Sequence, residues 1–330
     1  LRHLDRLAGE KHDPNPTICF PTRGILQLGF NEAFRKRFHQ AAELQQLPAH
    51  LVRSVSAAEA SEIAGVALRV GGLFFLEGRL VSPAALCRAH LQHPNIEVRT
   101  GQTVAGLRRE SNEYVLQMRD GARYTTPCLV LACGGGLTGL APTGWIPVRR
   151  VRGQLLTLPE QSDTRALRSV VCYNGYVTPA VAGRHVVGAT FEEWNNAEHV
   201  LPEQNDWLLD QLIAQVPEFA ALRHESVRTG IEARVAFRIS GWDHLPFVGP
   251  LPDRERFAAD SDATEINQDH LHPGLFVLGG LGSRGIVFAP LAAELLAAGM
   301  TGEFLPLEIE LARLLAPARF LERQRRRCEI

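Results

Sequence analysis

A buried strand, a glycine turn and the start of an apolar helix follow one another near the end of this sequence. Residues 275–285 read Leu-Phe-Val-Leu-Gly-Gly-Leu-Gly-Ser-Arg-Gly, and an almost wholly apolar run follows them. Gly280, Gly282 and Gly285 leave the turn without bulky side chains, and the first amides of a helix carry partial positive charge. The segment therefore predicts a site for a flat or anionic ligand.

The position of this segment argues against the usual meaning of its glycine spacing. The pattern G-x-G-x-x-G normally opens a βαβ unit that binds a dinucleotide, and the remaining strands of the sheet must follow it. Too few residues follow Gly285 to supply those strands. A nucleophile elbow around Ser283 is also excluded, because Leu281 occupies the first glycine position of G-x-S-x-G. A purely structural strand–turn–helix remains the alternative.

The composition indicates a globular protein large enough for two domains. The 330 residues are 45% hydrophobic and 22% charged, with a net charge of −1, so the overall field does not favour nucleic acid. The one dense basic cluster, at 323–327, is expected to be a solvated tail. We find no run of about 18 apolar residues that would span a membrane. The first residues lack the pattern of a signal peptide.

Six cysteines are spread along the chain without a C-x-x-C pair. Cys128 and Cys133 lie in an apolar run. We interpret all six as buried thiols in a reducing compartment, since neither a disulfide framework nor a metal site is indicated. The sequence therefore predicts no metal site.

The first half of the chain predicts a specific order of elements. Helical patterns in 1–70 are broken by a proline-rich stretch at 13–21. Ser82-Pro83 is a typical helix start, with an N-cap followed by proline, and predicts a helix through Leu91. Strands are expected at 95–100 and 103–110, and a hairpin at 114–126 turns at Asp120-Gly121. A fully buried strand from Cys128 then ends in three glycines.

The pattern changes after Arg149. Short strands are expected at 153–158, 175–179, 185–189 and 234–239, with one helix at 203–215, which indicates an antiparallel domain. Together with the late strand–glycine–helix segment, this order predicts an α/β (α+β) fold. We expect an FAD-binding domain of the glutathione-reductase type, interleaved with an antiparallel-sheet substrate domain.

Several segments resemble blocks of the D-amino-acid-oxidase/glycine-oxidase superfamily, in the same order. They are RGQLLTL at 152–158, GYVTPA at 175–180, VVGATFEEWN at 186–195, AFRISGWDHLPFVGPLPD at 236–253 and LFVLGGLGSRGIVFAPLAAELLA at 275–297. With GGLFFLEGRLVSPAALCRAHL at 71–91, the set is similar to the FAD-dependent oxidoreductase module of the bifunctional tRNA wobble-uridine enzymes, the MnmC family. The resemblance covers essentially the whole chain.

The resemblance implies a division of the chain into two domains. Residues 80–148 and 269–330 would form the FAD-binding domain, and residues 1–79 and 149–268 the substrate domain. Residues 1–80 contain none of the family's N-terminal G-x-G-x-x-G, so we expect the chain to begin about one βαβ unit into the module and to hold FAD weakly. Arg79 also replaces an expected tryptophan. Family members usually carry a tRNA methyltransferase domain as well, and we expect a monomer.

The resemblance also implies an activity. The substrate would be a cytoplasmic tRNA that carries 5-carboxymethylaminomethyl-2-thiouridine at the wobble position. FAD-dependent oxidation of the carbon beside the amine would release glyoxylate and leave 5-aminomethyl-2-thiouridine. Two alternatives remain: an oxidase of small free amines similar to glycine or sarcosine oxidase, and an inactive, truncated remnant.

The family positions suggest roles for particular residues. Arg238 is expected to grip the carboxymethyl group through its guanidinium fork. Tyr176 and Arg284 are expected beside the substrate or the flavin. Asp243 is expected to cap a loop. The residues expected to bind the cofactor are Val104, Ala132, Cys133, Gly134, Arg152, Gly153, Gln154, Gly280, Leu281, Gly282, Ser283, Arg284, Gly285 and Ile286.

Overall fold

A computed structural model of the protein describes residues 18–45, 48–224, 226 and 228–328. It divides the chain into two compact units. Unit 1 comprises residues 1–97 and 152–236, and unit 2 comprises 98–151 and 237–330. Residues 80–97, 149–151 and 237–268 fall in the other unit from the one that the predicted domain bounds give them. The chain passes between the units three times, so both are built from segments far apart in sequence.

Unit 1 contains most of an eight-stranded sheet with the strand order β14-β10-β13-β12-β11-β2-β4-β3. The pairing of β11 with β2 is parallel, whereas β10–β13, β11–β12, β12–β13, β2–β4 and β3–β4 are antiparallel. Its strands are β2 (Ile25–Leu28), β3 (Val52–Val55), β4 (Gly72–Phe75), β10 (Val148–Pro159), β11 (Val170–Cys172), β12 (Tyr176–Val177), β13 (Arg184–Gly188) and β14 (Glu232–Gly241). β10 and β14 continue into unit 2. A separate small ladder pairs β1 (Cys19–Phe20) with β5 (Leu80–Val81).

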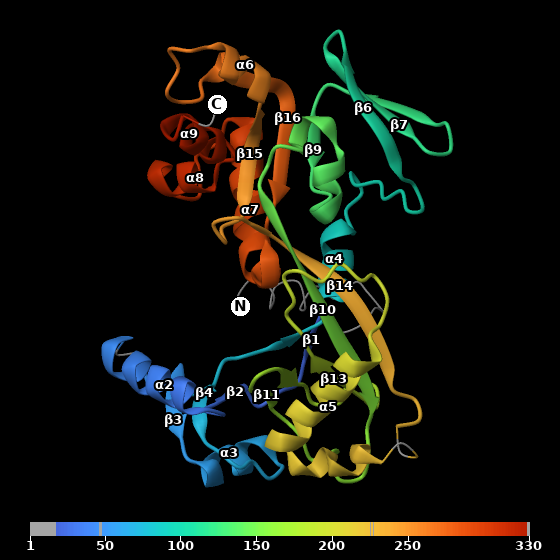
Figure 1. The fold of residues 1–330 in the computed structure, drawn as a ribbon, viewed down its shortest axis with the longest axis vertical. Helices are drawn as coiled ribbons and strands as arrows, with labels where there is room; N and C mark the ends of the chain where they lie inside the picture. Colours follow the sequence, from blue (N-terminus) through green and yellow to red (C-terminus); the bar gives the residue numbers. More distant parts are fainter. Residues whose placement is uncertain (1–17, 46–47, 225, 227, 329–330) are drawn as a thin grey trace. The chain divides into compact units, whose positions relative to one another are not determined.

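Helices complete the core of unit 1. α5 (Pro202–Gln215) is drawn in yellow in Figure 1. It buries Leu208, Leu209 and Leu212 in a cluster with β2 and β10 side chains, as its apolar spacing requires. The other helices are α2 (Glu32–Gln45), α3 (Ala57–Ala64), α4 (Pro83–Leu91) and the 3₁₀ segment η3 (Pro217–Arg223). The predicted helix start at Ser82 is confirmed, because the Ser82 hydroxyl accepts a hydrogen bond from the Ala85 amide at 3.2 Å.

Unit 2 is a three-stranded sheet with the strand order β15-β16-β9, covered on both faces. Side chains alternate along β16: Leu275 and Val277 join one cluster with Tyr114 of the meander, while Phe276 and Leu278 pack with helix α7 on the other face. The strands are β15 (Phe247–Pro252), β16 (Leu271–Gly279) and β9 (Leu129–Leu131), and the meander is β6 (Val104–Glu110), β7 (Glu113–Met118) and β8 (Arg123–Thr126). Its helices are α6 (Arg254–Ala259), α7 (Gly285–Thr301), α8 (Ile309–Leu315) and α9 (Ala318–Arg326), and its 3₁₀ segments are η1 (Gly134–Gly139), η2 (Ala141–Thr143), η5 (Gln268–His270) and η6 (Gly282–Arg284).

The structure corrects three expectations, two about strands and one about the cysteines. Residues 95–100 were expected to form a strand but pair with no strand in the described part of the chain, and Val98 is 52% exposed. β9 is shorter and less buried than expected, since among the described residues it pairs on one side only, with β16. All six cysteines are exposed or half-buried, so the prediction of buried thiols was wrong.

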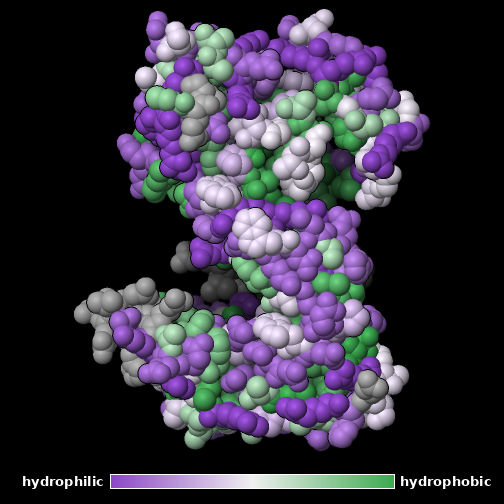
Figure 2. Space-filling model, viewed as in Figure 1, coloured by the Kyte–Doolittle hydropathy of each residue, from purple (hydrophilic) through white to green (hydrophobic). Residues whose placement is uncertain are grey.

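One helix is apolar enough to meet a membrane-span criterion, although the sequence was expected to contain no such segment. By length and composition alone, the 20-residue stretch Gly282–Thr301 could cross a membrane. One such helix is weak evidence for a membrane span; 22% of its apolar window is buried, and α7 packs Ala292 and Leu295 against the unit 2 sheet. Hydrophilic residues cover most of the face shown in Figure 2.

Candidate functional site

Two glycine-ended strands of unit 2 deliver their carboxyl ends to the same edge of the sheet. β9 and β16 are parallel neighbours, with Leu131 opposite Val277. Beyond this point β9 runs into Ala132, Cys133 and Gly134, and β16 runs into Gly280. Ligands of α/β sheets bind at such carboxyl ends. The structure therefore brings together most of the predicted cofactor-binding residues, and we call this place the glycine edge (residues 132–136 and 280–286).

The glycines of the late turn are required for different reasons. Gly280 has φ +70°, and a Cβ there would lie 2.8 Å from the Phe247 ring, so packing alone excludes a side chain. Gly282 has φ +57°, but a Cβ there would meet only the Ser240 Cβ, at 3.4 Å. The protein's own packing thus explains Gly280 fully, whereas Gly282 adopts a left-handed backbone in space that remains largely open.

Gly134 shows the clearest space for a ligand. It has φ +55°, and a Cβ there would meet no atom within 4 Å. Residues 132–136, Ser283, Arg284 and Ile286 are exposed. No side chain caps the start of α7, which continues directly from the 3₁₀ turn η6, where the Arg284 amide donates to the Leu281 carbonyl at 3.2 Å. An open, glycine-lined edge beside an uncapped helix start fits a flat cofactor with anionic groups such as FAD.

Arg238 lies near this edge in unit 2. It is on β14, two residues before Ser240, which forms a β-bridge with Leu281 of the glycine turn. Residues two apart on a strand share a face, so Arg238 is on the face of β14 that carries Ser240. Its side chain is half-buried. This placement is compatible with the predicted contact to a substrate carboxylate.

Asp243 caps a loop, as expected, and also forms an ion pair that the sequence did not reveal. Its carboxylate accepts a hydrogen bond from the Leu245 amide at 3.3 Å. Arg319 of α9 donates to both carboxylate oxygens, at 2.9 and 3.0 Å. Burial acts to raise the pKa of Asp243, but Arg319, the Leu245 amide and Arg323 outweigh it and lower the pKa below its ordinary value. Asp243 is therefore a structural anion that ties the turn at 241–245 to α9.

Arg152 and Gln154 were predicted to lie over the flavin, but their side chains are fully engaged inside unit 1. Arg152 is fully buried and donates to the Ala197 and His199 carbonyl oxygens, at 2.8 and 2.7 Å. It also donates to Gln154 at 2.8 Å and pairs with Glu192 at 3.2 Å. These bonds fix the segment from Glu192 to His199. Gly153, between these two residues, is half-buried. Contact between its backbone and a cofactor remains a proposal.

Tyr176 and Val104 belong to other sheets than the one that forms the glycine edge. Tyr176 is on β12 of unit 1, opposite Gly188, and a Cβ on Gly188 would lie 2.7 Å from the Tyr176 hydroxyl. Gly188 therefore makes room for the phenol ring. Val104 begins β6 of the unit 2 meander and is 37% exposed. The roles predicted for both residues remain predictions.

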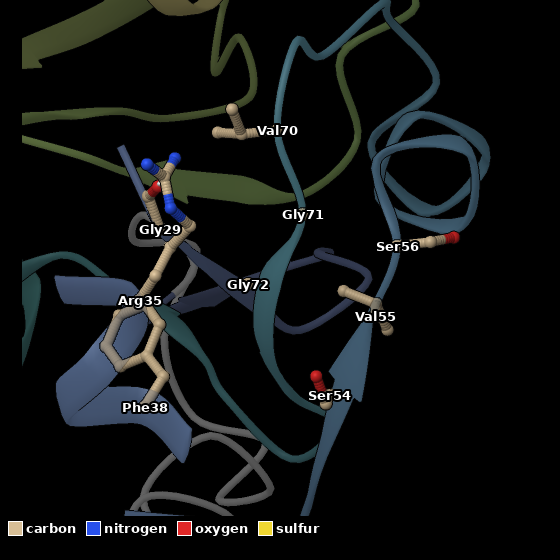
Figure 3. A pocket seen from close by; sticks show the side chains of 9 residues that line it. All are labelled: Gly29, Arg35, Phe38, Ser54, Val55, Ser56, Val70, Gly71 and Gly72. Atoms are coloured by element: carbon tan, nitrogen blue, oxygen red, sulfur yellow. Dashed lines mark hydrogen bonds between the residues drawn. The ribbon is translucent and has the colours of Figure 1, made fainter. Parts of the chain in front are cut away.

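A cavity of about 430 Å³ in unit 1 contains none of the predicted residues (Figure 3). Arg35 reaches across its mouth and donates to the Gly29 carbonyl at 3.4 Å. A Cβ on Gly71 would lie 2.1 Å from the Val55 carbonyl oxygen. Close backbone packing thus explains Gly71, one of the three glycines that line this cavity, and the glycine edge remains the candidate site. Among the described residues, no cluster of His, Cys, Asp and Glu could hold a metal ion.

Comparison with known proteins shows the family of this chain. The family described as FAD dependent oxidoreductase matches residues 1–298. The chain belongs to this family. It is 38% identical, over 90% of its length, to the tRNA 5-methylaminomethyl-2-thiouridine biosynthesis bifunctional protein MnmC of Pseudomonas putida, and 38% identical over 91% to that of Pseudomonas fluorescens. It spans 46% and 47% of these two proteins, so about half the length of the relatives it matches.

Solved structures show the same fold. Glycine oxidase from Bacillus cereus matches 93% of the chain with a TM-score of 0.71 and 19% identity, and the chain covers 79% of it. Iminodiacetate oxidase from Chelativorans matches 96% with a TM-score of 0.74 and 20% identity, and the chain covers 80% of it. The predicted fold class and the resemblance to the MnmC oxidoreductase module are both confirmed. The chain is an FAD-dependent oxidoreductase by family.

Proposed function

We propose that this chain oxidises the carboxymethylaminomethyl group of a thiolated wobble uridine in tRNA, a CH–NH donor. The amine loses two electrons and two protons to become an imine, and addition of water releases glyoxylate and the aminomethyl uridine. FAD, when bound, supplies the two-electron oxidation. The relatives that are 38% identical are named for tRNA thiouridine biosynthesis, which favours this substrate over free amino acids.

The observation that carries the proposal is the glycine edge beside β14. Gly134 and Gly282 leave open space for the cofactor, and the amides at the start of α7 would stabilise negative charge that develops at its edge. Arg238 would hold the substrate carboxylate through a bidentate pair and so orient the carbon that is oxidised. A neutral amine needs little acid–base assistance, so no His/Asp dyad is required. A tRNA substrate would place the protein in the cytoplasm.

Glyoxylate release tests the proposal directly. The FAD-loaded protein is incubated with tRNA that carries the carboxymethylaminomethyl group and, in separate reactions, with glycine or sarcosine, because oxidation of these amines also yields glyoxylate. We expect glyoxylate from the tRNA. The free amines should show at least tenfold lower kcat/KM, because they lack the rest of the tRNA and so lose its binding energy. Preferential turnover of glycine would replace the proposal with the small-amine oxidase. Absence of turnover with FAD bound would contradict both functions.

A further inference from the structure

An exposed tryptophan and two arginines gather on the surface of unit 2 around the turn at 241–245. Trp242 is 58% exposed, and the guanidinium carbon of Arg149 lies 4.8 Å from the centre of its ring. His244 lies beside Arg149, with the two nitrogen atoms 3.2 Å apart. Arg323 approaches the same turn from α9. We call Trp242, His244, Arg149 and Arg323 the Trp242 surface. None of the predicted functional residues belongs to it.

Hydrogen bonds and an ion pair fix the turn that carries Trp242 to β10 and α9. The Trp242 amide donates to the Pro147 carbonyl at 3.1 Å, which fixes the turn to the start of β10. The bidentate pair between Asp243 and Arg319 fixes it to α9, and the side chains of both residues are at least 85% buried. Arg149 against one face of the indole limits the rotation of the ring. The ring is therefore ordered before any partner arrives, which lowers the entropic cost of binding.

The charge of the Trp242 surface favours an anionic partner. The carboxylate of Asp243 below this surface faces two guanidinium groups, those of Arg319 and Arg323, so these three side chains together carry a net positive charge. The net charge of the whole chain is −1, which makes this local excess a feature of the surface and not of the overall composition. Unpaired nucleotides combine a flat base with an anionic phosphate, and proteins bind them through aromatic rings and arginines.

We propose that the Trp242 surface binds an unpaired nucleotide of the RNA substrate, with its base stacked on Trp242 and its phosphate near Arg149 and Arg323. This inference rests on the proposed function and adds to it a surface that recognises the RNA outside the oxidised group. A broader apolar patch would favour a protein partner. Within this turn, the large apolar residue exposed beside Trp242 is Leu245, at 36% exposure.

Binding of a fluorescein-labelled anticodon stem-loop RNA, measured by anisotropy, tests the proposal. Trp242→Ala should weaken binding about tenfold, equivalent to 1.4 kcal/mol and within the range for one stacked base. Arg149→Gln should reduce the slope of log affinity against log salt by about 0.7, as expected for one lost phosphate contact with a single strand. Melting curves confirm that each variant is folded.

Two matched variants serve as controls. Trp194 of unit 1 is 85% exposed but lies beside Glu193, and Arg53 of unit 1 lies 5.7 Å from the Phe74 ring. Trp194→Ala and Arg53→Gln should leave RNA affinity within about twofold of the unsubstituted protein, because neither belongs to the positive surface. An affinity loss in these controls equal to that of Trp242→Ala would overturn the proposal.

The outcomes also separate this proposal from the proposed function. Glyoxylate release from tRNA with unchanged RNA affinity in Trp242→Ala would overturn the Trp242 surface and leave the enzyme activity intact. Weakened RNA binding in Trp242→Ala without any glyoxylate release would support the surface and contradict the activity. Equal displacement of RNA by polyglutamate and by unlabelled RNA would indicate a general anion site, and would overturn the assignment to nucleotides.

Discussion

Gly134→Ala is the substitution that best tests whether the glycine edge holds FAD. Gly134 has φ +55°, a conformation that alanine adopts at a cost of about 1 kcal/mol. The added methyl group meets no protein atom within 4 Å, so no packing cost is expected beyond this strain. For 330 residues that unfold together, 1 kcal/mol lowers the melting temperature by about 1–2 °C. The folded protein should therefore survive the change.

The effect on the cofactor should be much larger. If FAD lies against Gly134, the methyl group occupies space that the cofactor needs, and the overlap should weaken binding by at least about tenfold, or 1.4 kcal/mol. Quenching of FAD fluorescence during a titration measures the dissociation constant. The ratio of the FAD dissociation constants of the variant and the unsubstituted protein is informative even when both proteins bind FAD weakly.

Gly121→Ala is the matched control. Gly121 lies in the β7–β8 hairpin of the same unit, has φ +89°, and a Cβ there also meets nothing within 4 Å. Both variants carry the same kind of backbone strain and similar stability loss, so any difference in FAD affinity reports the position of the cofactor. Equal FAD affinity in the two variants, with equal melting temperatures, would refute the assignment of FAD to the glycine edge.

Three further predictions follow from the described contacts. Arg238→Lys should lower kcat/KM for carboxymethylated tRNA by about 30-fold, since a point charge replaces a bidentate fork worth about 2 kcal/mol; unchanged kinetics would exclude Arg238 from the site. Arg152→Gln should lower the unfolding free energy by about 3 kcal/mol in a urea titration, because it breaks a buried network; a loss below 1 kcal/mol would show that the network relaxes. His185 is buried, and that burial lowers its pKa. Its contribution to stability is therefore present above pH of about 6.5 and is lost as the pH falls through the lowered pKa. In a His185→Gln variant, the melting temperature should depend less on pH between pH 7 and 5.

Local chemistry was sufficient to predict elements whose signals are short in sequence. The helix from Pro83 to Leu91 follows from an N-cap serine and a proline, and the β7–β8 hairpin follows from Asp120-Gly121. Both depend on neighbouring residues only. The strand expected at 95–100 failed for the opposite reason, since a strand needs a partner and the described residues supply none. The same absence of a second neighbour leaves β9 more exposed than an apolar run predicts.

Long-range contacts were beyond the sequence patterns. Asp243 and Arg319 are 76 residues apart, and nothing local in either segment predicts their pairing. Arg152 and Gln154 were selected by resemblance as cofactor contacts, but the structure shows their side chains holding the loop from Glu192 to His199. The family motif therefore identified important positions. It could not distinguish a side chain that contacts the ligand from one that supports the surrounding loop.

The glycines of the late turn show why a motif match is weak evidence for a ligand. Gly280 is fixed by the Phe247 ring, which a Cβ would approach to 2.8 Å. Gly285 has φ −55°, a helical value open to any residue, and a Cβ there would be 3.8 Å from the Leu281 Cβ. Gly282 alone of the three combines a left-handed backbone with open space. The match to G-x-G-x-x-G thus combines a packing requirement, a permissive helix position and one plausible ligand contact. The stronger evidence for a cofactor is that Gly282 and Gly134 follow adjacent parallel strands, because two independent chain segments then leave space at the same edge.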